Sequence, residues 1–237
     1  MNEDWRMAFM FDARDRAFEM MEQDLARAAG EILQLAGEAH VRLGVADRHP
    51  DLADLGDDTE SDIENGRSVD GAVEISVSAS RRAELPDIAV ALYNILQGFA
   101  APSSLEVMAG PYYSMVPVRD GNTFLSLAFR RDPAMTSAQF QRWWHDQHAV
   151  VAIPVLGPGL LAYDQVHVDA ITTEQLANAI RVAPVHYDAY DNLTWSDHRA
   201  FLQSISDQED MARVYQDEVG RIDNSSRRHA LMRKLRG

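Results

Sequence analysis

Apolar residues recur along this chain with two different spacings, and each spacing predicts one type of element. Within residues 69–79, Val73, Ile75 and Val77 alternate with polar or small residues, which is typical of a strand with one buried face. Within residues 18–36, apolar side chains recur every three or four positions, which predicts an amphipathic helix. The chain therefore mixes strands and helices.

The same pattern predicts elements along the whole sequence. We expect strands at 6–11, 39–46, 69–79, 105–118, 124–130, 160–168, 187–194 and 226–235, and helices at 18–36, 84–99, 137–148, 195–205 and 210–222. Gly110-Pro111 is expected to interrupt the strand at 105–118. Residues 47–68 hold eight acidic side chains and few apolar ones, so we interpret them as a solvated loop.

The order of these elements repeats itself. Each half reads β-α-β-β-α-β, which is the ferredoxin-like order. Residues 7–11 (MAFMF) align with 125–129 (LSLAF), and residues 69–72 align with 187–190 at the same offset of 118. We infer a tandem duplication with halves at 1–118 and 119–237. Chance similarity between short apolar strands is the alternative.

The stretch from Phe124 to Asp169 carries the most informative pattern. Thr136 or Ser137 can cap the helix that follows the strand. Phe140, Trp144 and His148 are spaced four apart and share one face. We therefore expect His148 on the inward face, at the C-terminal end of the helix. In the next strand, alternation places Tyr163, Gln165 and His167 on one face.

This segment resembles the EthD-type family of dimeric α+β barrel proteins. The resemblance covers roughly residues 123–235. It is carried by Phe129-Arg130-Arg131, by the run from Phe140 to His148 with its Trp143-Trp144 pair, by Tyr163 with His167, and by Tyr187-Asp188. His145 departs from the pattern, because an ordinary polar or basic residue is expected there.

The resemblance implies a fold and a kind of site. In this family the barrel usually forms from two chains, so we expect an α+β fold in which two ferredoxin-like repeats form an intramolecular pseudo-dimeric α+β barrel. The family implies a cavity between sheet and helices for aromatic or polyketide-like molecules. It also implies proton-transfer chemistry without a cofactor, such as cyclisation, decarboxylation or dehydration.

Composition excludes several classes of function. The chain has 237 residues, a formal net charge of −15 and no cysteine. Thiol nucleophiles, disulfides and cysteine-ligated metals are therefore absent, and a nucleic acid or an anionic membrane is an unfavourable partner. No apolar stretch approaches about 18 residues, and the N-terminus does not resemble a signal peptide. We expect a cytoplasmic protein.

Four residues are candidates for catalysis. His148 can take and return a proton near neutral pH, although a satisfied core histidine is the simpler interpretation of a lone His. Tyr163 and His167 can polarise an oxygen on which charge develops, or can simply fill the core. Asp188 can orient an imidazole. Asp70 has the equivalent place in the first half, where there is no matching histidine to orient. A role shared by both aspartates would be structural, and this favours a structural role for Asp188.

Four further residues are candidates for substrate binding. Trp143 and Trp144 can line an aromatic pocket, although helix-to-sheet packing is the alternative. We place His145 at the mouth of the cavity. Tyr190, on the strand at 187–194, is near enough to line the pocket, although simple packing is the alternative. His145 and His148 have a spacing that can hold a metal, but a metal needs at least one more ligand. We therefore expect no metal and no cofactor.

The functional expectation is a cofactor-independent lyase or cyclase that acts on a phenolic or polyketide-like molecule. Retro-aldol cleavage belongs to the same class, because it needs only a base and a partner for the oxyanion. Two alternatives are a cofactor-free or haem-linked monooxygenase and a non-catalytic accessory protein that binds aromatic ligands. The sequence does not define the substrate, and it leaves further pairing of chains into a homo-oligomer open.

Overall fold

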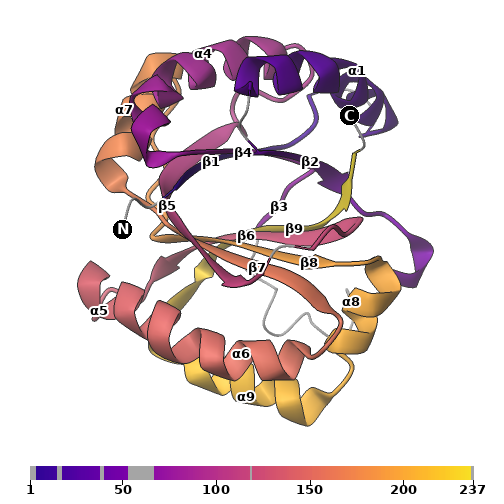
Figure 1. Cartoon of the computed structure of the whole chain (residues 1–237), viewed down its shortest axis with the longest axis vertical. Coiled ribbons are helices and arrows are strands. Elements are labelled where there is room, and N and C mark those ends of the chain that lie inside the picture. The colour runs from indigo at the N-terminus through magenta and orange to yellow at the C-terminus, as the bar shows by residue number, and fades with distance from the viewer. Residues whose placement is uncertain (1–3, 15–17, 38–39, 53–66, 118, 236–237) are drawn as a thin grey trace.

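The structure is a computed structural model that describes residues 4–14, 18–37, 40–52, 67–117 and 119–235. A ring of strands lies at its centre, and one layer of helices covers each side (Figure 1). Helices α1, α4 and α7 form one layer, and α5, α6, α8 and α9 form the other. The expected α+β class is therefore confirmed.

The strands of each half lie side by side in the same order. The first half contains β1 (Trp5–Phe11), β2 (His40–Ala46), β4 (Gly71–Val77) and β5 (Glu106–Val116) in the order β2-β4-β1-β5. The second contains β6 (Thr123–Arg131), β7 (Leu160–His167), β8 (Ala189–Trp195) and β9 (Ile222–Lys234) in the order β7-β8-β6-β9. Within the described residues, pairings β5–β7 and β2–β9 close these eight antiparallel strands into one barrel. A short strand, β3 (Arg67–Ser68), pairs with β9 in parallel.

The helices bury their apolar faces against the outside of this barrel. In the first half these are α1 (Phe18–Ala36) and α4 (Leu85–Leu96), preceded by the short helix η2 (Ala79–Glu84). In the second half these are α5 (Ser137–Trp143), α6 (Ala149–Leu156), α8 (His198–Ser204) and α9 (Gln208–Glu218). The predicted spacing of α1 is confirmed, since Met21, Leu25 and Ile32 are fully buried.

The two halves share their detailed register. Phe11 pairs with Gly71, and Phe129 pairs with Ala189, which again is an offset of 118. The Asp70 carboxylate accepts a hydrogen bond from the Ala13 N–H at 2.8 Å, and that of Asp188 accepts one from the Arg131 N–H at 3.0 Å. This agreement supports the alignment of the halves. Their common origin and the boundary at 118 stay predictions.

Two expectations about elements were wrong, and one helix was missed. Strand β5 continues through Gly110-Pro111, because a glycine allows β7 to approach: a Cβ on Gly110 would lie 1.9 Å from the His167 carbonyl oxygen. The helix after β6 continues to Leu156 instead of ending at His148. Helix α7 (Ala170–Ile180) was not predicted. The interpretation of 47–68 as a loop falls largely on 53–66, which lie outside the described residues.

Each half sends one connector across to the helices of the other half. Helix α7 joins β7 to β8 of the second half, yet it packs on α4 and β5 of the first (Figure 1). The connector after β2 forms a short helical turn, η1 (Pro50–Leu52). Its Leu52 packs against the apolar cluster that contains Leu156 and Phe201 in the second half. The connectors therefore link the two halves in both helix layers, one on each side of the barrel.

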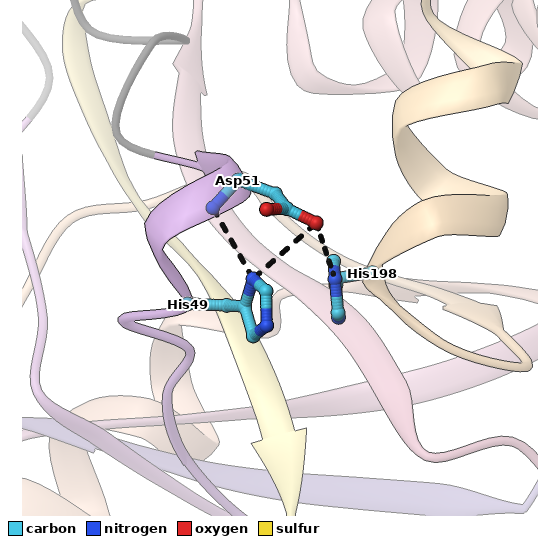
Figure 2. Close-up of side chains that lie close together, drawn as sticks. All are labelled: His49, Asp51 and His198. Atoms are coloured by element: carbon cyan, nitrogen blue, oxygen red, sulfur yellow. Dashed lines mark hydrogen bonds and ion pairs between the residues drawn. The ribbon is translucent and has the colours of Figure 1, made fainter.

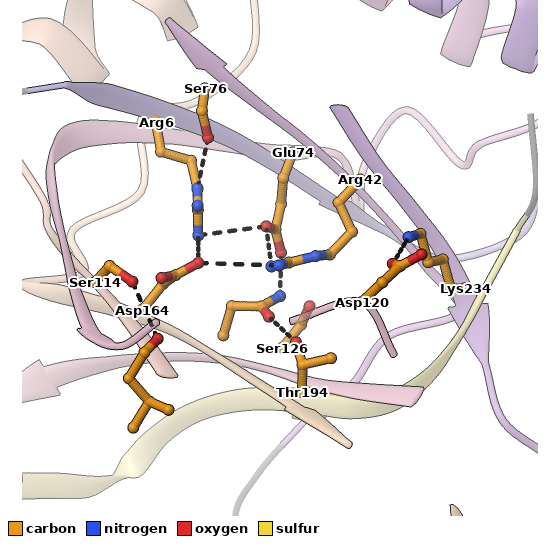
Figure 3. Close-up of polar contacts among 12 residues, drawn as sticks. Arg6, Arg42, Glu74, Ser76, Ser114, Asp120, Ser126, Asp164, Thr194 and Lys234 are labelled. Carbon is orange, nitrogen blue, oxygen red and sulfur yellow. Dashed lines mark hydrogen bonds and ion pairs between the residues drawn. The ribbon is translucent and has the colours of Figure 1, made fainter. Parts of the chain in front are cut away.

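The barrel interior holds a network of buried charges that also joins the halves (Figure 3). Arg6 contacts Asp164 at 2.8 Å, and Arg42 contacts Glu74 at 3.0 Å. Glu74 also accepts hydrogen bonds from Tyr190 and Asn192 of β8, both at 2.5 Å. These groups are buried but paired, which offsets the cost of removing their charges from water. No described helix is long and apolar enough to cross a membrane.

Candidate active site

A cavity of about 530 Å³ lies between the outer face of the second-half sheet and the helices α6, α8 and α9. Its wall is mainly apolar and includes Leu125, Leu193, Trp195 and Phe201. The connector after β2 contributes to the same wall through Leu52. A mainly apolar cavity with a few converging polar groups is the usual form of a small-molecule site.

Four polar groups that line this cavity come from four different elements of the second half. They are His148 from the helix after β6, Tyr163 from β7, Asp191 from β8 and Glu218 from α9. Alternation along β8 directs Asp191 outward to the helices, while its neighbours Tyr190 and Asn192 point into the barrel. The sequence prediction that His148 and Tyr163 meet at one cavity is therefore consistent with the structure.

His148 lies in a widened helical turn in the middle of a helix. Thr136 and Gln139 form a capping box that starts α5, as predicted for Thr136. Residues Trp144–His148 then form a π-helical turn before α6 begins. The expected position of His148 at a helix end was therefore wrong. Turns of this type recur at functional sites, and here the turn brings His148 next to the Trp143 ring, 5.0 Å away between centroids.

Asp217 of α9 holds the imidazole ring of His148. Its Oδ2 lies 3.0 Å from Nδ1 of His148, and its Oδ1 accepts a hydrogen bond from Trp143 Nε1 at 3.4 Å and one from the Arg221 guanidinium. A carboxylate at Nδ1 favours the tautomer that carries its proton there and leaves the lone pair on Nε2. That Nε2 lies 3.9 Å from Oε1 of Glu218, which also lines the cavity.

Asp191 is a buried carboxyl group opposite this imidazole. It is 4% exposed, and its Oδ1 has no hydrogen-bond partner in the described residues. Burial and the nearby Glu218 carboxylate raise the pKa of Asp191 well above its ordinary value, while the Tyr163 hydroxyl and Arg227 oppose that rise. Burial and the Asp191 charge also raise the pKa of Tyr163 well above 10. Both groups therefore favour their protonated forms and can act as hydrogen-bond donors.

His167 lies apart from this cavity lining. Its ring stacks on Trp144 at a centroid distance of 5.1 Å, and its Nε2 is buried without a hydrogen-bond partner among the described residues. Burial, with a smaller contribution from His145, lowers the pKa of His167 to about 4. Gln165 on the same strand face donates to the Tyr163 hydroxyl at 2.9 Å. His167 therefore supports the helix packing and does not face the cavity.

The other predicted residues have packing or surface positions. Trp144 is fully buried and packs between Phe129 and His167. Trp143 packs beside the His148 ring and donates a hydrogen bond to Asp217. His145 is partly exposed, contacts Asp146 at 2.8 Å and is not part of the cavity wall among the described residues.

Two predicted roles on β8 and its start are not supported. Tyr190 points into the barrel, where it bonds to Glu74 and Ser126, so its expected place at the cavity was wrong. Asp188 is not part of the cavity wall among the described residues, and its carboxylate is held by Arg131. The shared contact of Asp70 and Asp188 with the chain after the first strand supports the structural interpretation.

Sequence reasoning missed Asp191, Asp217 and Glu218. Asp191 had a usable signal, since it is an acidic residue in the middle of a predicted apolar strand. Asp217 and Glu218 had none, because acidic residues are ordinary on a polar helix such as 210–222. Their approach to His148 depends on how α9 packs beside α6.

Comparisons with known proteins support the fold and one domain. The EthD domain model matches residues 132–225, so the expected resemblance is confirmed over that range. That range includes His148, Tyr163 and Asp191. None of the curated proteins matches the sequence significantly.

Solved structures extend the likeness to the whole chain. A "putative monooxygenase" from Lactobacillus acidophilus NCFM has a TM-score of 0.54 at 10% identity and covers 100% of this chain and 95% of its own. One from Fusobacterium nucleatum subsp. nucleatum has a TM-score of 0.55 at 10% identity, with 99% and 94% covered. A variant of the chlorite dismutase from Candidatus Nitrospira defluvii has 0.54 at 10% identity, with 99% and 93% covered. The protein therefore shares the fold of the chlorite dismutase-like α+β barrels.

Proposed function

We propose that the protein is a cofactor-independent enzyme that performs acid-base chemistry on a small aromatic molecule in the cavity of its second half. The observation that carries this proposal is the pair of His148 and Asp217 at the wall of a mainly apolar cavity. Such a pair gives an imidazole with a fixed orientation and a basic nitrogen on one side.

The residues divide into a base and two donors. Nε2 of His148 takes a proton from the substrate, and the imidazolium that forms is stabilised by Asp217. Tyr163 and the protonated Asp191 donate hydrogen bonds to the substrate oxygen on which negative charge develops. The same imidazolium then returns its proton to the product carbon or to a leaving oxygen. This sequence serves decarboxylation, dehydration, cyclisation and retro-aldol cleavage, and it needs no redox step.

The residues of the cavity wall favour an aromatic substrate that carries few charges. Trp195 and Phe201 line it and pack edge to face at 5.0 Å between ring centroids. Flat apolar rings gain most from such walls. The cationic group of Arg227 in the cavity wall contacts the Glu218 carboxylate at 2.5 Å. A neutral phenol therefore suits the site better than a multiply charged anion.

Monooxygenation is the second candidate, because two structural neighbours carry the description "putative monooxygenase". In a cofactor-free form, His148 would deprotonate a phenol that then reacts with O₂, so the same residues would serve. A haem-linked form is less compatible with the residues present. Nε2 of His148 faces Glu218 at 3.9 Å, and Arg227 holds that carboxylate in place. This donor set does not fit a haem iron.

A panel of phenolic acids and diphenols tests the proposal. We expect crystals soaked with the panel to show one compound within about 3.5 Å of His148 Nε2. We also expect mass spectrometry to show conversion of that compound under nitrogen as well as in air. His148→Gln should abolish conversion but keep binding, while His186→Gln at an exposed position serves as the control.

Three outcomes would contradict the proposal. Strict dependence on O₂ would favour the monooxygenase. Binding without conversion by the unaltered protein would favour an accessory ligand-binding role. A bound compound that lies away from His148 would remove this residue from the mechanism.

A further inference from the structure

A second group of polar side chains lies at the edge of the cavity, where the first-half connector meets helix α8 (Figure 2). His49 and Asp51 belong to the turn around η1, and His198 is the first residue of α8. The two imidazole rings stack at 4.0 Å between centroids with an angle of 24° between their planes. The carboxylate of Asp51 lies beside both rings.

The atoms that can bind a metal point toward one another. Oδ2 of Asp51 lies 3.6 Å from Nδ1 of His49 and 3.4 Å from Nε2 of His198, and the three ligand atoms lie within 4.8 Å of one another. Tetrahedral ligands that bind zinc at about 2.0–2.1 Å stand about 3.3 Å apart. Two of the distances are therefore close to the required separation. Rotation of the partly exposed His49 side chain can bring its Nδ1 to the same separation from Nε2 of His198.

His198 provides an independent indication of a ligand. Its Nε2 is buried and makes no hydrogen bond within the described part of the chain, although it faces a carboxylate. Buried polar atoms without a partner are rare in folded proteins and call for an explanation. A cation bound between this nitrogen and Asp51 would satisfy both groups.

We propose that His49, Asp51 and His198 form a binding site for one divalent transition metal of the zinc type. Two imidazoles and one carboxylate match the preference of Zn²⁺ and Co²⁺, whereas Mg²⁺ and Ca²⁺ prefer oxygen ligands only. The ion uses the Nδ1 lone pair that now accepts the Asp51 N–H at 3.2 Å. It also displaces Arg199, whose guanidinium lies 3.8 Å from Asp51 and whose side chain is 78% exposed.

The position of this site defines what the metal does. Arg48 and Leu52 of the connector line the cavity, as do Phe201 of α8 and Ile205 directly after it. An ion held by His49, Asp51 and His198 therefore fastens the two elements that form this edge of the cavity wall. It is a structural metal ion that holds this part of the wall in place, and it takes no part in the proton transfer at His148.

Metal titration of the whole chain tests this site. The purified protein is treated with a chelator, exchanged into buffer without metal and titrated with CoCl₂. We expect one equivalent to bind and to produce the visible absorption bands of a four-coordinate Co²⁺ site. Zn²⁺ should then displace the colour with a stoichiometry of one.

Substitutions locate the ion. His49→Ala and His198→Ala should each weaken Co²⁺ binding at least tenfold, and His186→Ala, an exposed histidine elsewhere, should leave it unchanged. His49 is partly exposed, so circular dichroism and the melting temperature without metal should match those of the unaltered protein. Hydrogen exchange should slow on metal addition in residues 47–52 and 198–204.

Several results would overturn the proposal. Failure to bind Co²⁺ or Zn²⁺ at millimolar concentration would do so. Equal binding by the unaltered protein and His49→Ala would also do so. Loss of binding in His145→Ala, with His49→Ala unaffected, would move the ion to the helix that carries His148.

Discussion

Asp217 accepts a hydrogen bond from Nδ1 of His148 at 3.0 Å, although the two residues lie 69 positions apart in the chain. The contact joins the π-helical turn after α5 to the C-terminal part of α9. It directs the other ring nitrogen of His148 toward the cavity side that holds Glu218. The orientation of the proposed base is therefore set by a residue on a different helix.

Asp217→Asn should lower kcat by about 10²- to 10⁴-fold, because the amide no longer holds the imidazole in one tautomer or stabilises its charged form. The size of the side chain is kept, so KM should change little. Nitrogen NMR of labelled histidine should show the Nδ1–H tautomer of His148 in the unaltered protein and a mixture in the variant. Glu209→Gln on an exposed position of α9 is the matched control. An unchanged kcat would show that Asp217 has only a packing role.

Asp191→Asn should make the protein more resistant to unfolding as pH rises. Its folded pKa is raised by burial and by Glu218, so the unfolded chain loses this proton near pH 4 while the folded protein keeps it. Between that pH and the folded pKa, the unaltered protein loses about 1.4 kcal/mol of stability per pH unit through this group. Asparagine stays neutral and avoids the loss.

Urea unfolding at several pH values from 4 to 8 measures this difference. The advantage of Asp191→Asn should grow with pH, while catalysis should fall because an amide N–H is a weaker hydrogen-bond donor than a carboxyl O–H. Asp210→Asn on the exposed side of α9 should follow the unaltered protein. A constant difference over this range would mean that Asp191 ionises normally in the folded state.

His167→Phe should protect the protein against mild acid. The folded pKa of His167 is lowered to about 4 by burial, so the unfolded chain gains a proton below about pH 6.5 that the folded protein does not. Stability is therefore lost as pH falls from about 6.5 to about 4. Phenylalanine keeps the stacking on Trp144 and cannot be protonated. Between pH 7 and pH 5, the free energy of unfolding should fall by about 2 kcal/mol less in the variant than in the unaltered protein.

Equilibrium unfolding at pH 7 and pH 5 checks this expectation. His186→Phe, at an exposed position, should leave the pH dependence as it is. Equal acid sensitivity of His167→Phe and the unaltered protein would show that His167 is protonated in the folded state.

Asp188→Ala should destabilise the protein by about 1–3 kcal/mol, because the Arg131 N–H and guanidinium lose their acceptor. For a chain of this size the melting temperature should fall by about 2–4 °C per kcal/mol. Affinity for a cavity ligand should stay unchanged, since Asp188 does not line the cavity. A normal melting temperature with lost activity would restore the catalytic interpretation.

The pattern of apolar residues was sufficient to predict most of the fold but only part of the site. The boundaries of α1 and the alternation on β7 follow from local spacing, and the structure confirms them. Helix α7 was missed because its apolar face is short and packs on the opposite half, which local spacing does not reveal.

In the site too, residues that are close in sequence were found, and residues that come together only through packing were missed. His148 and Tyr163 were found because they lie in one contiguous segment with a family pattern. Asp217 approaches His148 only through the packing of α9 beside α6, and no feature of its own helix marks it. The π-helical turn at Trp144–His148 was also hidden, because its sequence suits an ordinary α-helix.

The barrel closes within a single chain through the pairs β5–β7 and β2–β9. A barrel assembled from two chains must meet its partner by diffusion, so its stability depends on protein concentration. Here the second half is always present at the high effective concentration that a covalent connection provides. Dilution therefore cannot open the barrel. The first half needs no site of its own to contribute to function, because its connector after β2 completes the wall of the cavity in the second half.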